Sequence, residues 1–124
     1  MMPAAGSSLT LPRANRVRRG GEYRRLRESG RREVLGCLIA NWRPLPEGQP
    51  SRVGVVASRR VGSAVVRNRA KRLLREAFRV HQHDFREPLE VVLVARPSIV
   101  GKRFGQVERD LLGVFARAKL LRSL

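Results

Sequence analysis

The sequence contains few cysteines, aromatic residues or acidic residues, and these shortages exclude several classes of protein. Cys37 is the single cysteine, which excludes an internal disulfide and favours a reducing cytoplasm. No apolar run approaches the roughly 18 residues of a membrane-spanning helix. The N-terminus also lacks the basic segment and apolar core of a signal peptide. The sequence therefore predicts a cytoplasmic protein that makes no use of a membrane.

The shortage of acidic residues argues against a catalytic centre. A protein nuclease that uses two metal ions needs several carboxylates at one site. Among ten acidic residues, only Asp84, Glu87 and Glu90 form a group of three in the sequence. The stretch 81–84, His-Gln-His-Asp, can be a metal site or a set of polar loop residues, and the second interpretation is favoured. No phosphate-binding loop or nucleophile motif occurs, so we expect no catalytic residue, no bound metal, no cofactor and no small-molecule substrate.

Basic residues are abundant. The chain has 27 lysines and arginines against ten acids, which gives a net charge of +17. All but three of the cations are arginine, whose planar fork suits bidentate phosphate contacts and stacking on bases, although genomic base composition can cause the same bias. This charge indicates a polyanionic partner: nucleic acid is favoured, and a membrane surface is the competing polyanion.

The most informative stretch is residues 53–79. A β-branched run, Val53 to Ser58, predicts a buried strand, and Ser63 stands where a helix N-cap belongs. The residues that follow have helical periodicity, with an apolar arc and a cationic arc. The apolar arc holds Val66, Ala70, Leu73, Leu74, Ala77 and Val80; the cationic arc holds Arg67, Asn68, Arg69, Lys71, Arg72, Arg75 and Arg79. Glu76 is the only acid on the cationic arc, and like charges at this spacing repel, so binding of a polyanion is favoured over a plain solvated surface.

The remaining pattern predicts one α+β domain. Residues 1–12 are expected to be a flexible tail, and residues 13–124 a single domain that binds nucleic acid. Besides the elements above, we expect a short helix at about 22–28, a first strand from Val34 to Trp42, a strand from Leu89 to Ala95, and a last helix from Phe104 or Gln106 to Leu121. The order is then α-β-β-α-β-α, with helices in one layer.

Residues 58–72, Ser-Arg-Arg-Val-Gly-Ser-Ala-Val-Val-Arg-Asn-Arg-Ala-Lys-Arg, resemble the signature of the bacterial ribonuclease P protein subunit. The resemblance extends over nearly the whole chain, including the basic segment Leu11 to Val17, the strand Val53 to Val56 and the segment Glu108 to Leu112. It implies a ribosomal-protein-S5-domain-2-like sandwich. Such a fold has a central, mostly antiparallel sheet and an unusual left-handed crossover through the basic helix.

The resemblance also implies a function. In this family an RNA subunit performs the Mg²⁺-dependent hydrolysis that removes the 5′ leader from precursor tRNA, and the protein binds both that RNA and the leader. Carried onto this sequence, the residues that bind the catalytic RNA are Arg59, Arg60, Arg67, Asn68, Arg69, Lys71, Arg72 and Arg75. Those that bind the leader are Tyr23, Asn15, Arg16, Ser58 and Arg59, with the Tyr23 ring stacking on a base.

Several alternatives remain open from the sequence. Asn41 or Trp42 occupies the place where the family often has a tyrosine, and Trp42 either lines the leader groove or faces the core. Cys37 is interpreted as a small buried residue rather than a reactive thiol. A ribosomal or other structural RNA-binding protein would have the same charge, and a stand-alone nuclease is disfavoured by the scattered acids.

Overall fold

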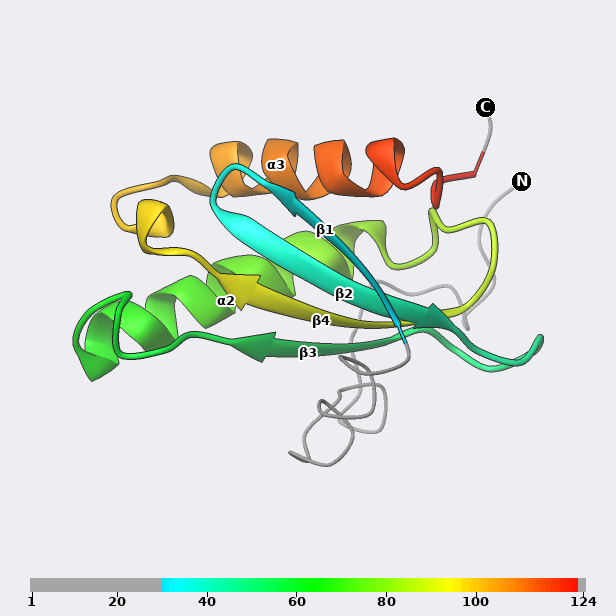
Figure 1. Cartoon of the computed structure of the whole chain (residues 1–124), viewed down its shortest axis with the longest axis horizontal. Coiled ribbons are helices and arrows are strands. Elements are labelled where there is room, and N and C mark those ends of the chain that lie inside the picture. Colours follow the sequence, from blue (N-terminus) through cyan, green and yellow to red (C-terminus); the bar gives the residue numbers. More distant parts are fainter. Residues whose placement is uncertain (1–29, 123–124) are drawn as a thin grey trace.

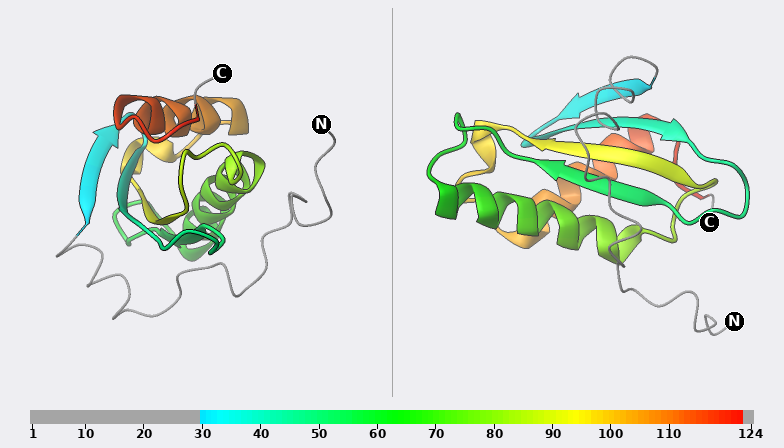
Figure 2. Two further views of the ribbon diagram at one scale, coloured as in Figure 1. Left: turned by 90° about the vertical axis from the view of Figure 1, so that its right-hand side faces the viewer. Right: turned by 90° about the horizontal axis from the view of Figure 1, so that it is seen from below.

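The computed structural model describes residues 30–122, which form a four-stranded sheet with helices on one face (Figures 1 and 2). The sheet order is β1-β2-β4-β3. β1 pairs antiparallel with β2, and β2 with β4, whereas β3 and β4 are parallel. The elements are β1 (Arg31–Leu35), β2 (Leu38–Pro44), β3 (Arg52–Val56), α2 (Ala64–His81), β4 (Leu89–Ala95), the 3₁₀ helix η3 (Pro97–Ile99) and α3 (Phe104–Arg117).

The connection β3-α2-β4 joins two parallel neighbours and is left-handed. In Figure 1 both strands point left, β4 lies above β3, and α2 lies behind the sheet. The two views of Figure 2 place α2 on that same side. Parallel strands are nearly always joined by right-handed crossovers. The exception implied by the resemblance is therefore present, and it places α2 beside the edge strand β3.

The core lies between the sheet and the two helices. Side chains alternate along β4, so Leu89, Val91, Leu93 and Ala95 face the helices and are buried. α2 contributes four buried residues and α3 another four: Ala70, Leu74, Ala77, Phe78, Val107, Leu111, Val114 and Phe115. The rings of Phe78 and Phe115 flank Phe85, with centroids 5.6 and 4.9 Å from its own. This shared core fixes α2 against α3.

The opposite face of the sheet carries a buried carboxylate between two arginines. Glu90 lies on the central strand β4, directly opposite Arg43 of β2 and Arg52 of β3. Its two oxygens accept hydrogen bonds from Arg43 Nε at 2.8 Å and Arg52 Nη1 at 2.9 Å. Because Glu90 is only 1% exposed, these charge-assisted bonds offset its desolvation. The pairing also fixes the register of three strands.

The predicted strand from Val34 to Trp42 is wrong in one respect, because it is two strands joined by a tight turn. Gly36 at that turn has φ +59°, which favours glycine, and a Cβ there would collide with the Asp110 carboxylate. Asp110 instead accepts a hydrogen bond from the Cys37 backbone N–H at 3.0 Å. Burial and the Asp110 carboxylate raise the pKa of the Cys37 thiol to about 12, which supports a structural role for Cys37.

The other expected elements are close to those observed. β4 has the predicted bounds, and α2 begins after Ser63 as predicted. The strand β3 ends at Val56 rather than Ser58, and α3 ends at Arg117 rather than Leu121. The predicted tail 1–12 and the helix at 22–28 lie outside the described residues and stay predictions. None of the helices within 30–122 is long and apolar enough to cross a membrane.

Candidate nucleic-acid interface

A compact turn at residues 58–62 connects β3 to α2 and holds two exposed arginines. The Ser58 backbone C=O accepts from Val61 N–H at 3.0 Å, and the Ser58 hydroxyl accepts from Arg60 N–H at 3.3 Å. Val61 is buried and anchors the turn. Gly62 has φ +147°, a conformation that other residues rarely adopt. The Arg59 and Arg60 side chains thus lie in solvent beside the first turn of α2.

Ser63 caps the N-terminus of α2. Its hydroxyl accepts a hydrogen bond from Val66 N–H at 3.4 Å, and its backbone C=O accepts from Arg67 N–H at 2.8 Å. The first turn of α2 contains no acidic residue, so nothing in the helix neutralises its partial positive charge. Together with Arg59 and Arg60, this helix end presents positive charge to an anion.

Replacing Ser63 with Ala should lower the free energy of unfolding by about 0.5–1 kcal/mol, because one cap hydrogen bond is lost. The hydrogen bond is long and exposed, which places the loss in the lower half of the usual range. Urea denaturation of the isolated protein measures it, with Ser63→Thr as a control that keeps a capping hydroxyl. An Ala variant as stable as wild type would show that the cap contributes nothing.

The exposed side of α2 carries cations that lack carboxylate partners in the described part of the chain. Asn68, Arg69 and Arg72 are exposed. Arg67 and Lys71, predicted to face solvent, are half-buried at the flank of the helix, because the buried arc also includes Phe78. We define the basic surface as the cations of the turn and the start of the helix together with the Asn68 among them: Arg59, Arg60, Arg67, Asn68, Arg69, Lys71 and Arg72. No acidic side chain of residues 30–122 forms an ion pair with any of them.

The C-terminal half of α2 differs from the basic surface. Arg79 forms a two-pronged hydrogen bond with Glu76, at 2.9 and 2.6 Å. The Arg79 hydrogen bond lowers the pKa of Glu76, and the same bond raises the pKa of Arg79. Arg75, which was predicted to bind the catalytic RNA, lies between Arg72 and Arg79 along the helix and is half-buried. Within α2, the exposed cations without a carboxylate partner among residues 30–122 therefore lie in the N-terminal half.

His81, the last residue of α2, connects the helix to α3. Its ring nitrogens lie 2.8 Å from the carboxylates of Asp84 and Glu108. Burial lowers the pKa of His81, but the hydrogen bonds and charges of both carboxylates outweigh it, so the pKa is raised above 6.5. Because both ring nitrogens contact carboxylates, protonated His81 forms an ionic link from the end of α2 to Glu108 of α3. The loop interpretation of residues 81–84 is thus only partly right, since His81 is helical.

The free energy of unfolding should fall as pH rises above 6.5, the ordinary pKa of histidine, and through the raised pKa of His81. A raised folded-state pKa means that the protonated His81 stabilises the fold fully below the unfolded value of 6.5, and this contribution is lost as pH rises through the folded value. Urea denaturation at a series of pH values measures it. His81→Gln should abolish this fall, whereas His83→Gln should retain it. An equal slope in the His81 variant would contradict the ionic link.

The clustered acids of the sequence do not converge on one site. Asp84 contacts His81, Glu90 binds Arg43 and Arg52, and Glu87 lines a polar pocket. No group of three histidines, cysteines or acids in the described part of the chain is arranged to hold a metal ion.

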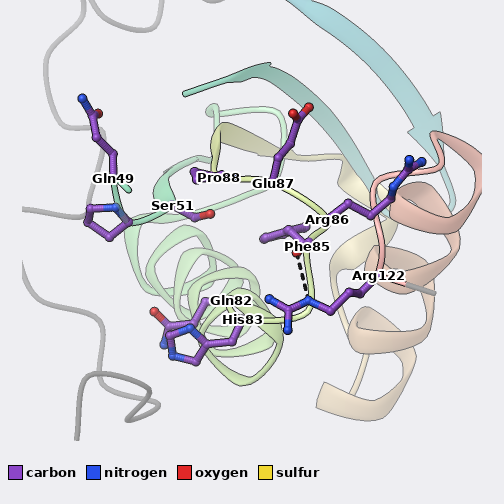
Figure 3. A pocket seen from close by; sticks show the side chains of 10 residues that line it. Gln49, Ser51, Gln82, His83, Phe85, Arg86, Glu87, Pro88 and Arg122 are labelled. Carbon is purple, nitrogen blue, oxygen red and sulfur yellow. Dashed lines mark hydrogen bonds between the residues drawn. The ribbon is translucent and has the colours of Figure 1, made fainter. Parts of the chain in front are cut away.

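A polar pocket that the sequence did not predict lies past the C-terminal end of α2 (Figure 3). The turn at 58–62 lies at the other end of this helix (Figure 1). It has a volume of about 210 Å³. Arg122 Nε donates to the Phe85 carbonyl at 3.4 Å across one wall. Its lining includes Ser51, Gln82, His83, Arg86 and Glu87. Charges of both signs surround it.

The predicted leader-binding residues are only partly described. Tyr23, Asn15 and Arg16 lie outside residues 30–122, whereas Ser58 and Arg59 lie in the turn before α2. Trp42 is buried in the core between sheet and helices, at 5% exposure. Its neighbour Asn41 points to the opposite face of the sheet, because side chains alternate along β2. Trp42 therefore does not substitute for a groove-lining aromatic residue.

Comparisons with known proteins agree on one family. The family model described as Ribonuclease P matches residues 11–119. The ribonuclease P protein component of Beutenbergia cavernae is 39% identical over 103 residues, covering 83% of this chain and 87% of that protein. The component of Clostridium acetobutylicum is 30% identical over 108 residues, covering 86% and 91%.

Solved structures confirm the predicted α+β fold. The RNase P protein from Staphylococcus aureus superimposes with a TM-score of 0.78 at 24% identity, covering 89% of this chain and 100% of that one. The RNase P protein from Thermotoga maritima gives a TM-score of 0.71 at 25% identity, covering 82% and 96%. With the match over residues 11–119, these likenesses establish that the chain belongs to the ribonuclease P protein family.

Proposed function

We propose that this protein is the protein subunit of ribonuclease P and binds the catalytic RNA through its basic surface. The observation that carries this proposal is the run of cations from Arg59 to Arg72, which pairs with no carboxylate in the described part of the chain. The capped N-terminus of α2, whose first turn contains no acidic residue, adds to the positive potential of the basic surface. Phosphates of a folded RNA would replace the missing counter-charges.

The protein and the RNA subunit have different roles in this proposal. In this proposal the RNA subunit carries out the Mg²⁺-dependent hydrolysis, and the protein contributes no metal ligand. The protein positions the substrate on the catalytic RNA. It binds this RNA, and it holds the 5′ leader of precursor tRNA in a groove that includes Tyr23, Asn15, Arg16, Ser58 and Arg59. Cleavage then releases the leader and gives the mature 5′ end of the tRNA, in the cytoplasm.

Phosphate contacts and leader contacts have separate roles in this proposal. Phosphates carry charge but no sequence information, so the basic surface fixes where the protein lies on the RNA. A single strand is held differently, by stacking of bases on side chains above a basic rim. Ser58 and Arg59 lie at the end of β3, next to α2, and so adjoin the basic surface.

A general structural RNA-binding protein is the alternative to be tested. The protein is titrated into its cognate catalytic RNA and into a ribosomal RNA fragment of equal length, each over a range of salt concentrations. We expect tighter binding to the catalytic RNA, with a steep fall in affinity as salt increases. Equal affinity for both RNAs at every salt concentration would contradict the proposal and favour a general RNA-binding role.

A further inference from the structure

Two exposed valines line one apolar cavity beside the basic surface. Val65 is 78% exposed and Val100 is 52% exposed, and they are the large apolar side chains that residues 30–122 leave in solvent. Both line a cavity of about 240 Å³ between the start of α2 and the η3 segment. The other lining residues are Val66, Arg69, Ala70, Ile99 and Gly101. Two valines alone are a small apolar patch, so the case for a binding surface depends on the cavity that they line and on the cations around it.

Val65 lies in the middle of the cations rather than beside the core. Val65, Arg69 and Arg72 are four and three residues apart, so they share one face of α2. A β-branched residue there has low helix propensity and buries nothing in the free protein. The nearest acid on this helix, Glu76, is already bound to Arg79. A ligand for this cavity must therefore be apolar at its centre and negative around it.

The Arg69 side chain is held in place at the edge of the cavity. Its Nη2 donates to the backbone carbonyl of Lys102 at 2.9 Å, which connects α2 to the segment before α3. A guanidinium fixed in this way loses little entropy when it binds, and its planar group can stack on a base as well as contact a phosphate. Arg69 is thus better placed to contact a base than the exposed, untethered side chains of Arg59 and Arg60.

We propose that this cavity binds one unpaired base of the catalytic RNA. This inference rests on the proposed function. Proteins recognise RNA sequence mainly through unstacked bases, which stack on aromatic rings or guanidinium planes. Val65 and Val100 cover the base, Arg69 stacks on it or bonds its edge, and Arg72 contacts the adjacent phosphate. The cavity is smaller than the roughly 300–1,000 Å³ of sites for drug-sized ligands, which suits a single ring system.

The double variant Val65→Ser, Val100→Ser tests the proposal by affinity. Both side chains are exposed, so we expect the fold to remain intact. The dissociation constant for the catalytic RNA should rise roughly 5- to 10-fold, the low end for loss of a base contact. The slope of log K against log salt should not change, because no phosphate contact is lost. Val65→Ile with Val100→Ile is the matched control and should bind like wild type.

Chemical probing of the RNA identifies the base. With wild-type protein, one unpaired nucleotide should be protected from dimethyl sulfate or carbodiimide, and the serine variant should restore its reactivity. Hydroxyl-radical protection of the RNA backbone should be the same for both proteins. Arg69→Lys, which keeps the charge but not the planar group, should restore the same reactivity without changing the salt slope.

Three outcomes would overturn the proposal. Unchanged affinity and probing for the serine variant, with weakened binding by Arg59→Ala and Arg60→Ala, would refute the base site and leave the proposed function intact. A larger sedimentation coefficient for the wild-type protein than for the serine variant, both without RNA, would show that the valines bind a second copy of the protein instead. If wild-type protein failed to prefer the catalytic RNA at all, the proposed function itself would be wrong.

Discussion

Replacing Arg59, Arg60 and Arg72 with Ala should weaken binding to the catalytic RNA and flatten its salt dependence. All three side chains are exposed and lack a carboxylate partner within residues 30–122. Each lost phosphate contact lowers the slope of log K against log salt by about 0.7–0.9. The ratio of the variant's dissociation constant to that of wild type should therefore fall roughly 20- to 40-fold between about 50 and 200 mM salt.

The matched control removes three other exposed arginines, Arg31, Arg32 and Arg109. It changes the net charge by the same amount but leaves the basic surface intact, so its slope should stay close to that of wild type. Filter binding at four or more salt concentrations gives both slopes. Equal flattening in the two triple variants would show that net charge, and not the basic surface, determines binding.

Replacing Tyr23 with Ala should weaken binding of precursor tRNA by roughly 5- to 100-fold in the reconstituted complex, because stacking on an aromatic ring contributes about 1–3 kcal/mol per base. Mature tRNA lacks the leader, so its binding should hardly change, and neither should assembly with the catalytic RNA. Dissociation constants for the two tRNAs, measured with the same complex, give the effect directly.

Tyr23→Phe is the matched control and should be nearly silent, because stacking needs the ring and not the hydroxyl. Equal weakening of precursor and mature tRNA by the Ala variant would point to general damage to the complex. Loss of folding would identify Tyr23 as a packing residue. Either result would place the leader groove elsewhere.

Local patterns in the sequence predicted the elements that position the basic surface. Ser63 starts α2 because its hydroxyl can cap a helix, and β4 matches its apolar run from Leu89 to Ala95. The hairpin at Gly36 was missed, because an unbroken apolar run continues after it and the turn depends on Asp110, far away in the sequence. Periodicity could not decide where Trp42 points until the pairing of β2 was known.

The details of the interface could not be predicted, because they depend on contacts between distant segments. Arg67 lies two residues before Arg69 and so points to another flank of α2, where it is half-buried rather than fully exposed. The tether from Arg69 to the Lys102 carbonyl spans 33 residues of sequence. The left-handed crossover, which brings α2 beside β3, follows from no local pattern and was implied only by the resemblance.

Cleavage of precursor tRNA tests the central claim most directly. The purified protein is added to precursor tRNA with and without its cognate catalytic RNA, at a Mg²⁺ concentration where that RNA alone cleaves slowly. The 5′ end of the product is then mapped. We predict no cleavage by the protein alone, and faster release of the leader, at the mature 5′ end, when protein and RNA are combined. Cleavage by the protein alone, or no effect of the protein on cleavage by the RNA, would contradict its assignment as the protein subunit of ribonuclease P.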